Sequence, residues 1–441
     1  MIGLRRLGVV AVLSVLALVG VLAGPASATN DTYFSRQWAL EQIKAPQAWT
    51  RSTGSGITIG IVDTGVDAGH PDLAGKVVAT ADCVGRPCAV GAGQDNHGHG
   101  TMVSGIAAAA TNNGKGVAGV APDARLVVAK VLNSSGEGRV EDINNGIRWV
   151  VDNGARVVNL SLGDPNFLVS SVLGTPLRSA IEYAWSKGAV PVLASGNYAT
   201  GLGDLGTENY GNINALVVGA TDRNGNVPGY SSAIGNAKWG LVAPGGSGSG
   251  SPDNNVISTF LTGGGSGYAS SAGTSMSAPH VSGAVALLLA QGLSAGAAVT
   301  RLLSTLDKGS PCGSGCQGRL NLAAAVGADG APATTAPPAA PATTKAPSPP
   351  RTTVPRPTTT RPPATTTSTA PPTTTTTTVA PPPGSAQSTD AGELAAPEVL
   401  PAGASPGLNP ALVTTAVLLL VVVGGAAGGA GARQLRAGAR P

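Results

Sequence analysis

Charged and aromatic residues are scarce in this chain. Of its 441 residues, 11% are charged and 3% are aromatic, and the formal net charge is only +4. Lysine and arginine form no continuous stripe along the sequence. A charge this small and this scattered argues against nucleic acid as a partner and is typical of an ordinary protein surface.

Cysteine is also rare, with four residues that fall into two close pairs. The pairs are Cys83 with Cys88 and Cys312 with Cys316. In an exported protein, which meets an oxidising environment, such cysteines are expected to pair. The spacing suggests the disulfides Cys83–Cys88 and Cys312–Cys316, provided that the loop geometry permits each bridge. A zinc site made from all four thiolates is the alternative.

The first 28 residues match a secretory signal peptide. Arg5 and Arg6 give a basic start, an apolar run follows over residues 7–23, and Ala26-Ser-Ala28 fits the small-x-small rule for cleavage. We therefore expect cleavage after Ala28 and export of the remaining chain. An uncleaved anchor helix is the alternative, which the shortness of the run disfavours.

The composition changes abruptly after the first three quarters of the chain. Residues 327–408 consist mainly of Pro, Thr and Ala. Such a segment cannot bury a core, so we expect a disordered linker. Pro-rich chain extends by about 3.1 Å per residue, which would let this linker act as a stalk on the order of 200 Å long.

Residues 409–432 are the candidate membrane anchor. Residues 411–432 carry no charge and are long enough to cross a bilayer of roughly 30 Å. Arg433, Arg436 and Arg440 follow directly, and positive residues stay on the cytoplasmic side. We therefore expect a single-pass transmembrane helix in the cell membrane, an extracellular body and a cytoplasmic tail over residues 433–441. A soluble helix at this end is the alternative.

Between these ends, residues 29–326 alternate apolar strand candidates with helical stretches. Strands are expected at residues 57–62, 125–132, 157–162, 190–194 and 216–220. Helices are expected at residues 99–110, 140–152 and 177–187 and from residue 273 to residue 290. Such alternation predicts an α/β domain with a mostly parallel sheet covered by helices on both faces. In such sheets, sites lie at the carboxyl ends of the strands.

Four polar residues stand at such ends or at the start of a helix. They occur in Ile61-Val-Asp63-Thr-Gly65, Asn96-His-Gly-His99-Gly-Thr101, Ala194-Ser-Gly-Asn197 and Gly273-Thr-Ser275-Met-Ser277. A carboxylate after a buried strand is costly unless it is hydrogen-bonded or functional. Taken singly, each residue also has a structural interpretation. Asp63 and Asn197 could form turns, His99 or the neighbouring His97 could be structural, and Ser275 could cap its helix.

Taken together, three sequence blocks are specific. Asp63-Thr-Gly65, His99-Gly-Thr101 and Gly273-Thr-Ser-Met-Ser-Ala-Pro-His280 resemble, in order and spacing, the signature blocks of the subtilisin-like serine proteases, or subtilases. The resemblance covers residues 31–326 and is greatest with the thermitase branch, to which residues 43–49, 70–77 and 111–119 are also similar. It implies a three-layer subtilisin-like α/β fold and a serine endopeptidase.

The resemblance assigns a role to each polar residue. Asp63, His99 and Ser275 correspond to the triad that forms an acyl-enzyme, with Ser275 as nucleophile and His99 as general base. His99 rather than His97 takes this role because it begins the His-Gly-Thr block. Asn197 corresponds to the side-chain donor of the oxyanion hole.

The resemblance also implies how a polypeptide substrate binds. The primary specificity pocket would be lined by Ser161, Leu162, Gly163, Ala194, Ser195 and Gly196. Residues 135–138, which include Gly136, would offer an extended edge that pairs with the substrate backbone. Backbone pairing selects little for sequence, so we expect broad endopeptidase action by a monomeric catalytic domain.

One structural Ca²⁺ is implied by the thermitase resemblance. Its ligands are all oxygen atoms, as a hard cation requires. They would come from the side chains of Asp31, Asp72 and Asn113 and from the carbonyl groups of Ala110, Lys115 and Val117. Residues 82–94 correspond to a second, weaker calcium loop of that branch but are not rich in Asp, so we expect no second site there.

Two departures from the family pattern bear on activity. Met102 stands where many subtilases have a second histidine after the His-Gly-Thr block. That position is outside the triad, so activity is expected to survive. Only a few residues separate the expected cleavage site from the protease body. The prodomain that relatives usually carry is therefore not expected, which leaves the control of activity unexplained.

Two other functions remain open at this point. The order of signal, protease, Pro-rich linker and anchor is also similar to that of the mycosins, proteases of specialised secretion systems, although the mycosins' N-terminal extension is not found. An inactive, wall-anchored binding protein on a protease scaffold is the other possibility. The intact triad and Asn197 argue against it.

Overall fold

The structure is a computed structural model of the chain. It describes residues 29–162, 176–197, 210–249, 251–263, 265–310, 312–328 and 398–399. The predicted signal peptide, transmembrane segment and tail lie outside the described residues, as do Gly163 and nearly all of the predicted linker.

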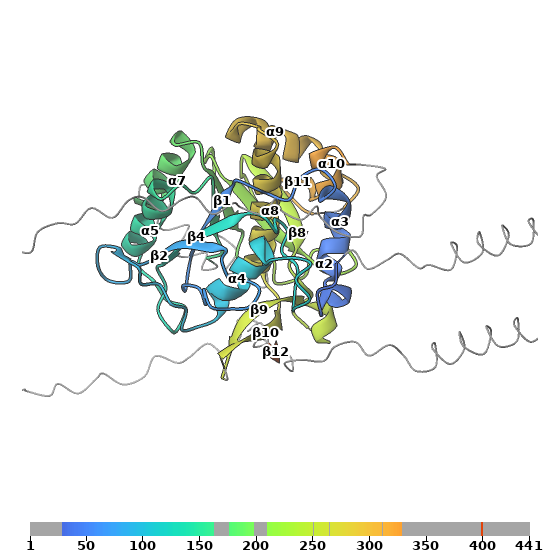
Figure 1. Ribbon diagram of the computed structural model, residues 1–441. Coiled ribbons are helices and arrows are strands. Elements are labelled where there is room, and N and C mark those ends of the chain that lie inside the picture. The colour runs from blue at the N-terminus through green and yellow to red at the C-terminus, as the bar shows by residue number, and fades with distance from the viewer. Residues whose placement is uncertain are drawn as a thin grey trace, which may run out of the picture. The chain divides into compact units, whose positions relative to one another are not determined.

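A nine-stranded sheet forms the centre of the domain (Figure 1), in the order β11-β8-β7-β6-β5-β1-β4-β2-β3. All neighbouring strands are parallel except β2 and β3, which are antiparallel. The bounds are β1 (Thr58–Asp63), β2 (Val77–Asp82), β3 (Ala89–Val90), β4 (Arg125–Lys130), β5 (Val157–Leu160), β6 (Val190–Ala194), β7 (Leu216–Thr221), β8 (Trp239–Pro244) and β11 (Cys316–Arg319). The mostly parallel sheet expected from the sequence is confirmed.

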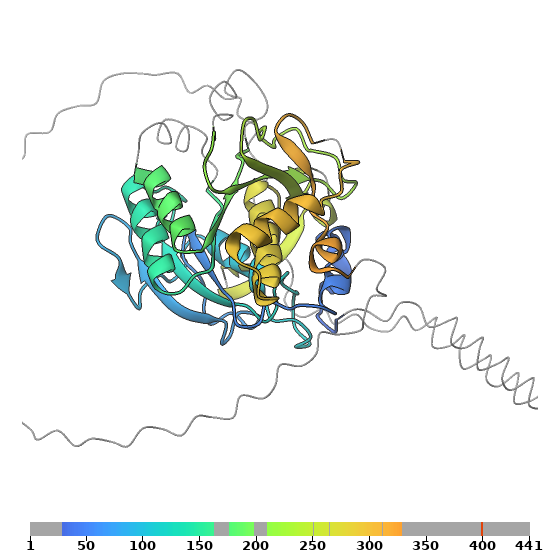
Figure 2. The same cartoon turned by 90° about the horizontal axis from the view of Figure 1, so that it is seen from above.

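Helices lie on both faces of this sheet. Figures 1 and 2 show α5 and α7 packed side by side, apart from α8. The helices are α2 (Trp38–Gln42), α3 (Ala45–Ala48), α4 (His99–Ala108), α5 (Val140–Asp152), α7 (Pro176–Ser186), α8 (Thr274–Ala290), α9 (Ala295–Ser304) and α10 (Leu322–Val326), with short 3-10 helices at η1 (Phe34–Arg36) and η3 (Pro252–Asn254). The four expected helices are therefore present, with ends that differ by at most two residues.

The strands divide their side chains between two cores. Ile59 and Ile61 of β1 pack in one core with α8, whereas Val62, the next residue, packs in the other with Ile143 of α5. This division follows from the alternation of side chains along a strand. It explains why the strands read as continuous apolar runs, since both faces of a covered parallel sheet are buried.

A second, smaller sheet lies beside α4. It consists of β9 (Val256–Thr262), β10 (Gly265–Ser271) and β12 (Glu398–Val399), all antiparallel. The sequence did not predict these strands. β12 lies inside the segment expected to be a disordered linker, so that expectation is wrong for residues 398–399.

The folded domain also extends past its predicted end at Val326. Ala328 is buried, and its backbone N–H donates to the carbonyl of Ala323 at 2.7 Å. Within the described residues, no single helix has the length and hydropathy needed to cross a membrane. In the part of the chain that the structure describes, α8 and α9 reach that threshold only when taken together, and they meet at a bend of 119°.

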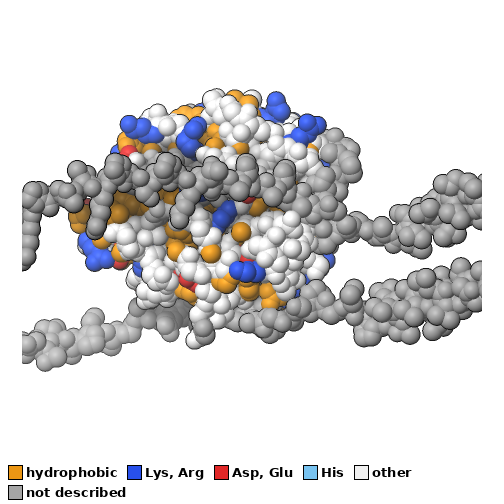
Figure 3. Space-filling view, in the orientation of Figure 1, with side chains coloured by type: hydrophobic (Ala, Val, Ile, Leu, Met, Phe, Trp, Pro, Cys, Tyr) orange, Lys and Arg blue, Asp and Glu red, His pale blue; other side chains and the backbone are white. Residues whose placement is uncertain are grey.

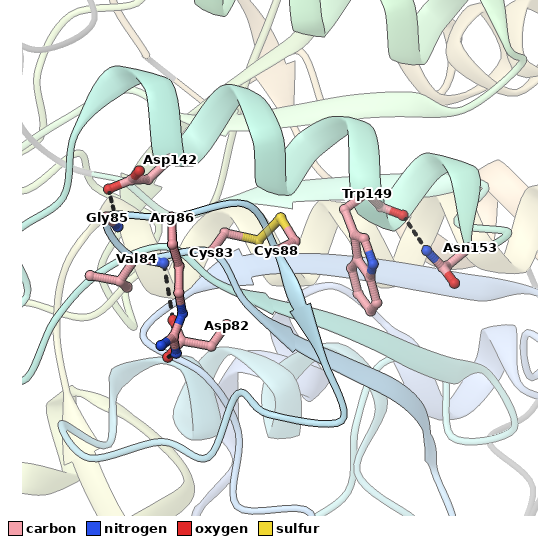
Figure 4. The surroundings of a disulfide bond; sticks show 9 residues. All are labelled: Asp82, Cys83, Val84, Gly85, Arg86, Cys88, Asp142, Trp149 and Asn153. Atoms are coloured by element: carbon pink, nitrogen blue, oxygen red, sulfur yellow. Dashed lines mark hydrogen bonds and ion pairs between the residues drawn. A yellow bond between two sulfur atoms is a disulfide. The ribbon is translucent and has the colours of Figure 1, made fainter. Parts of the chain in front are cut away.

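Both expected disulfides are present, which excludes the zinc alternative. Cys83 is bonded to Cys88 and Cys312 to Cys316, and the chain has no free cysteine. Figure 4 shows the first bridge close to Trp149 of α5. The loop that it closes is tied to the same helix, because the backbone N–H of Gly85 donates to Asp142 Oδ2 at 3.0 Å.

Charge is sparse on the molecular surface. On the face shown in Figure 3, the Lys and Arg side chains stand apart from one another among uncharged atoms. This face therefore has no continuous basic patch, in agreement with the low charge of the sequence.

Candidate active site

Asp63 and His99 meet at the carboxyl end of β1, an interior strand of the sheet. Asp63 is the last residue of β1 and is fully buried, and His99 is the first residue of α4. His99 Nδ1 lies 2.7 Å from Asp63 Oδ1, which also accepts the backbone N–H of Thr64 at 2.7 Å. A carboxylate can only accept from a neutral imidazole, so Nδ1 carries the proton and Nε2 has a free lone pair.

A glycine lets the helix start this close to the strand. A Cβ atom on Gly100 would lie 2.2 Å from the carbonyl oxygen of Gly65. The N–H of Gly100 also donates to Thr64 Oγ1 at 2.9 Å. The His-Gly-Thr and Asp-Thr-Gly blocks are therefore in direct backbone contact, which fixes the position of the imidazole relative to Asp63.

A second buried carboxylate, Asp95, organises the loop in front of α4. Its Oδ1 accepts from Thr64 Oγ1 and from the backbone N–H groups of His97 and Gly98, at 2.9–3.0 Å. Its Oδ2 accepts both the N–H and the hydroxyl of Thr101, at 2.9 and 2.6 Å. Burial alone would raise the pKa of Asp95, but these donors outweigh it and hold the pKa below its usual value.

Lys130, the last residue of β4, holds the turn that follows β1 by a hydrogen bond to Thr64. Its buried ammonium donates to the carbonyl oxygens of Thr64 and Leu132 and to Asn96 Oδ1, at 2.7–2.8 Å. Burial lowers the pKa of Lys130, while the neighbouring carboxylates oppose this effect. Thr64 is thus held through its carbonyl by Lys130 and through its hydroxyl by Asp95.

The electrostatics distinguish His99 from His97. Burial lowers the pKa of His99, but the charge and hydrogen bond of Asp63, with a further contribution from Asp95, raise it overall. Burial and the proximity of His99 lower the pKa of His97, whose ring lies 6.2 Å from that of His99. It is His99, and not His97, that is hydrogen-bonded to Asp63.

Ser275 is the second residue of α8, where backbone N–H groups have no partner within the helix. Its side chain is nearly buried, and its Oγ donates to the carbonyl of Ser161 at 3.2 Å. No hydrogen bond joins Ser275 to His99 in the described part of the chain. In this arrangement, the hydroxyl must rotate away from Ser161 before it can donate to His99.

Asn197 follows β6 and contacts the first residue of α8. Its Oδ1 accepts the backbone N–H and the hydroxyl of Thr274, at 2.9 and 3.0 Å. The hydroxyl of Thr274 also accepts the N–H of Gly196 at 3.1 Å. Because the amide oxygen is held by Thr274, the Nδ2 group at the other end of the amide is left to donate elsewhere.

Of the predicted pocket residues, Ser161 is hydrogen-bonded to Ser275, and the others described lie at the ends of β5 and β6. Ser161 and Leu162 follow β5 and are buried, Ala194 ends β6, and Gly196 bonds to Thr274 as described. Gly163 lies outside the described residues. The expectation of an extended edge at residues 135–138 is wrong for residues 135 and 136. Ser135 and Gly136 lie in a turn, because Asn133 Oδ1 accepts the N–H groups of Ser135 and Glu137.

The acidic residues expected to bind calcium also lie together. Asp31 accepts the N–H groups of Asn112 and Asn113, and Asp72 accepts Asn113 Nδ2 and the N–H of Val117. Burial raises the pKa of Asp31, and repulsion by Asp72 adds to the rise. No Lys or Arg forms an ion pair with either carboxylate in the described structure.

This donor set fits Ca²⁺ in its chemistry. Asp31 and Asp72 are buried, have no cationic partner among the described residues, and both accept hydrogen bonds from the loop that follows α4. In the same loop, the buried Thr111 Oγ1 has no partner within the described structure, and oxygen atoms of this kind are the ligands that Ca²⁺ prefers. In the present arrangement Asn113 turns its Nδ2 toward Asp72, and the carbonyl of Lys115 accepts the N–H of Thr32. No group of three or more His, Cys, Asp or Glu side chains suited to a metal occurs among the described residues.

Several residues that shape the site were not predicted from the sequence. They are Thr64, Asp95, Lys130, Asn159, Thr274 and Ser282. One usable signal was present: Asn159 and Ser161 are polar residues that alternate within the otherwise apolar run at 157–162. Polar side chains in a strand buried on both faces need partners, and here they find them on α8.

Comparison with known proteins agrees with this geometry. The profile of the Subtilase family matches residues 54–307. Thermitase of Thermoactinomyces vulgaris is 42% identical over 301 residues, covering 67% of this chain and 98% of thermitase. Subtilisin Savinase of Lederbergia lenta is 42% identical over 57% of this chain and 83% of its own length. A solved structure of proteases from Pseudoalteromonas arctica PAMC 21717 superposes with a TM-score of 0.60 and 31% identity, covering 68% of this chain and 99% of its own. This chain belongs to the subtilase family and is a subtilisin-like serine endopeptidase.

Proposed function

We propose that Ser275, His99 and Asp63 are the catalytic triad of an exported, membrane-anchored endopeptidase. The observation that carries the proposal is the 2.7 Å bond between His99 Nδ1 and Asp63 Oδ1. It fixes the imidazole in the tautomer whose Nε2 can accept a proton. A histidine held in this way acts as the general base for a neighbouring serine hydroxyl.

Hydrolysis then takes two steps. Ser275 Oγ attacks the carbonyl carbon of the peptide bond while its proton passes to His99 Nε2. The imidazolium, stabilised by Asp63, gives that proton to the leaving amine, and the C–N bond breaks. Water attacks the resulting acyl-enzyme ester with His99 again acting as base, and Ser275 recovers its proton as the acid product leaves.

Asn197 and the backbone N–H of Ser275 form the oxyanion hole in this proposal. The N–H of Ser275 belongs to the first turn of α8, where the helix dipole favours negative charge. Thr274 holds the oxygen end of the Asn197 amide, so the donor end serves the developing oxyanion. The uncharged residues around Ser161 and Gly196 suit a pocket for an uncharged substrate side chain.

Labelling with a fluorophosphonate tests the nucleophile. The probe forms a phosphonyl ester with an activated serine, so wild-type protein should be labelled and Ser275→Ala should not. Ser277→Ala is the matched control, because Ser277 lies on the same helix and its buried Oγ has no partner in the described structure. Correctly folded wild-type protein that takes up no label would overturn the proposal.

Export and anchoring are proposed from the composition of the chain ends. A signal peptide over residues 1–28, a linker beyond the folded domain, an anchor at 409–432 and a cytoplasmic tail at 433–441 would place the protease outside the cell. The two disulfides suit an oxidising compartment. External protease treatment of intact cells should release the catalytic domain, while an epitope after Pro441 should stay protected. A mycosin-like role would require genes for a secretion apparatus beside this one.

A structural Ca²⁺ at Asp31, Asp72 and Asn113, with the carbonyls of Ala110, Lys115 and Val117, is proposed as well. When bound, the ion would neutralise the buried carboxylate pair and tie the N-terminal arm to the loop that follows α4. It would take no part in peptide hydrolysis. Chelation should lower the melting temperature of the wild type. In Asp72→Asn the melting temperature should be lower from the start and insensitive to the chelator. An unchanged wild-type melt would contradict the proposal.

A further inference from the structure

A chain of buried hydrogen bonds connects the catalytic serine to the middle of α8 by way of β5. Ser282 Oγ donates to Asn159 Oδ1 at 2.8 Å, and Asn159 Nδ2 donates to Ser161 Oγ at 2.9 Å. Ser161 Oγ in turn donates to the backbone carbonyl of Ser275 at 2.8 Å. Asn159 and Ser282 have no exposed surface, and Ser161 is 2% exposed.

The donor and the acceptor of each hydrogen bond in this series can be assigned. A backbone carbonyl can only accept, so the single proton of Ser161 Oγ goes to Ser275. Ser161 Oγ must then accept from Asn159, which places Nδ2 on that side. Asn159 Oδ1 consequently faces Ser282, whose hydroxyl is its only donor among the described residues. Removal of Ser282 Oγ would leave a buried amide oxygen without a partner.

Because of the spacing of the four residues, this series of hydrogen bonds joins one face of α8 to one face of the β5 segment. Ser275 and Ser282 are seven residues apart, about two turns, and so lie on one face of α8. Asn159 and Ser161 are two residues apart and lie on one face of the β5 segment. The core around these bonds, between α8 and the sheet, is aliphatic and includes Val157, Val281 and Val285. Aliphatic contacts are non-directional, whereas these bonds fix both the rotation and the height of the helix.

We propose that Asn159 and Ser282 are positioning residues that set the place of Ser275 through Ser161. The inference rests on the proposed role of Ser275 as nucleophile. The backbone of Ser275 supplies an oxyanion donor and its side chain attacks, so a shift of α8 displaces both groups at once. Displacements of about 1 Å in such groups lower rates by up to ~10²-fold. Neither residue touches substrate, and both act through the serine that they hold.

The first experiment compares Ser282→Ala with Ser277→Ala. Each variant deletes one buried hydroxyl from α8, but only Ser282 Oγ is hydrogen-bonded. Active sites are counted by titration, and kcat and KM for a peptide anilide are measured well below the melting temperature. We expect Ser282→Ala to lower kcat per active site by roughly 10-fold with KM nearly unchanged. Ser277→Ala should keep wild-type values of both.

The second experiment separates positioning from stability. Asn159→Ala should lower kcat at least as much as Ser282→Ala, and the double variant should lose no more than Asn159→Ala, because both changes break one chain. The pH dependence of kcat/KM should stay that of the wild type, since no charged group is altered. If Asn159→Ala does not fold, the Ser282 comparison decides alone.

Equal kcat per active site in wild type and Ser282→Ala, whatever their melting temperatures, would overturn the inference. This outcome differs from a failure of the proposed function. In that case, Ser275→Ala would retain hydrolysis and wild-type protein would resist the fluorophosphonate.

Discussion

The Asp63–His99 side and the Ser275 side of the active site differ in the hydrogen bonds that hold them. On the first side, two buried carboxylates and a buried ammonium group bind the turn after β1 and the start of α4. On the second side, the hydrogen bonds that hold α8 near Ser275 come, within the described residues, from uncharged groups, among them the side chains of Asn197, Ser161 and Asn159.

This difference separates two requirements of the same reaction. Hydrogen bonds to charged groups are roughly twice as strong as neutral ones and depend on pH. They suit the general base, whose proton affinity must be adjusted. Neutral hydrogen bonds fix the geometry of a site without adding a charge. They suit a nucleophile and an oxyanion hole, because the rate depends most on where these groups lie. We therefore expect changes on the Asp63 side to move the pH profile and changes on the Ser275 side to alter the rate alone.

The largest effect is expected for Asp63→Asn. The amide keeps the shape of the carboxylate but no longer favours the Nδ1–H tautomer, and kcat should fall by ~10⁴-fold. The charge and hydrogen bond of Asp63 raise the pKa of His99. In the proposed mechanism, His99 must be neutral to act as the base. The acidic limb of kcat/KM should therefore lie at lower pH in the variant than in the wild type. Single-turnover acylation across pH measures both effects.

Asp67→Asn is the control for that experiment. Asp67 lies four residues away, and its carboxylate bonds to Gly69 and Ser266 rather than to His99. Its kcat and pH profile should stay close to the wild type. A loss in Asp63→Asn of less than tenfold would contradict the role of His99 as the base.

Asn197→Ala tests the neutral side. The variant removes one donor to the oxyanion, which typically lowers kcat by ~10²–10³-fold. KM should change little, because the oxyanion forms only in the transition state. The position of the acidic limb should not move, since no charge is lost. A change confined to KM, measured with the same peptide anilide, would argue that Asn197 serves substrate binding instead.

Asp95→Asn should have a smaller effect with a distinct signature. Asp95 contributes to the raised pKa of His99 without touching its ring, so the acidic limb should move to lower pH, in the same direction as in Asp63→Asn. The plateau rate should fall by about tenfold, because Asn cannot accept all five donors that hold the loop. A lower plateau with an unmoved limb would show that Asp95 acts only through the loop.

The sequence was sufficient for the fold class because both faces of the sheet are buried. The apolar runs that result are visible without a structure, and the glycine-flanked blocks around Asp63, His99 and Ser275 are specific. Strand ends were less accurate. β4 ends at Lys130 and β5 at Leu160, two residues before the apolar pattern ends in each case. Hydropathy continues past the last paired residue because the following residues are buried as well.

Residues that act through tertiary contacts could not be predicted from the sequence. Asp95 has the local appearance of a loop residue, and only the fold brings Thr64 and Thr101 to it. Ser282 resembles an ordinary small residue within a helix, and its partner Asn159 is 123 positions away. The strands β9 and β10 were missed for a different reason. β10 consists mainly of Ser and Gly, and the apolar residues of β9 stand in adjacent pairs, so neither strand has the alternating apolar pattern on which strand prediction depends.

The smallest effect on activity is expected for a substitution of His280. This residue lies on α8, in the uncharged half of the site, and its Nδ1 donates to the carbonyl of Met276 at 2.7 Å. Burial lowers the pKa of His280 from 6.5 to about 4. Between these two values the unfolded chain binds a proton that the folded protein excludes. The free energy of unfolding should therefore fall as the pH drops from 6.5 to 4, by up to about 3 kcal/mol from this group.

His280→Gln removes that titration while it keeps a donor of similar length. Urea unfolding at pH 7 and pH 4.5 should show a larger loss of stability in the wild type than in the variant, with similar kcat in both at pH 8. Equal losses would mean that His280 accepts a proton in the folded state. The Ser275 side would then contain a charge after all, and the pH profile of the enzyme would no longer report on His99 alone.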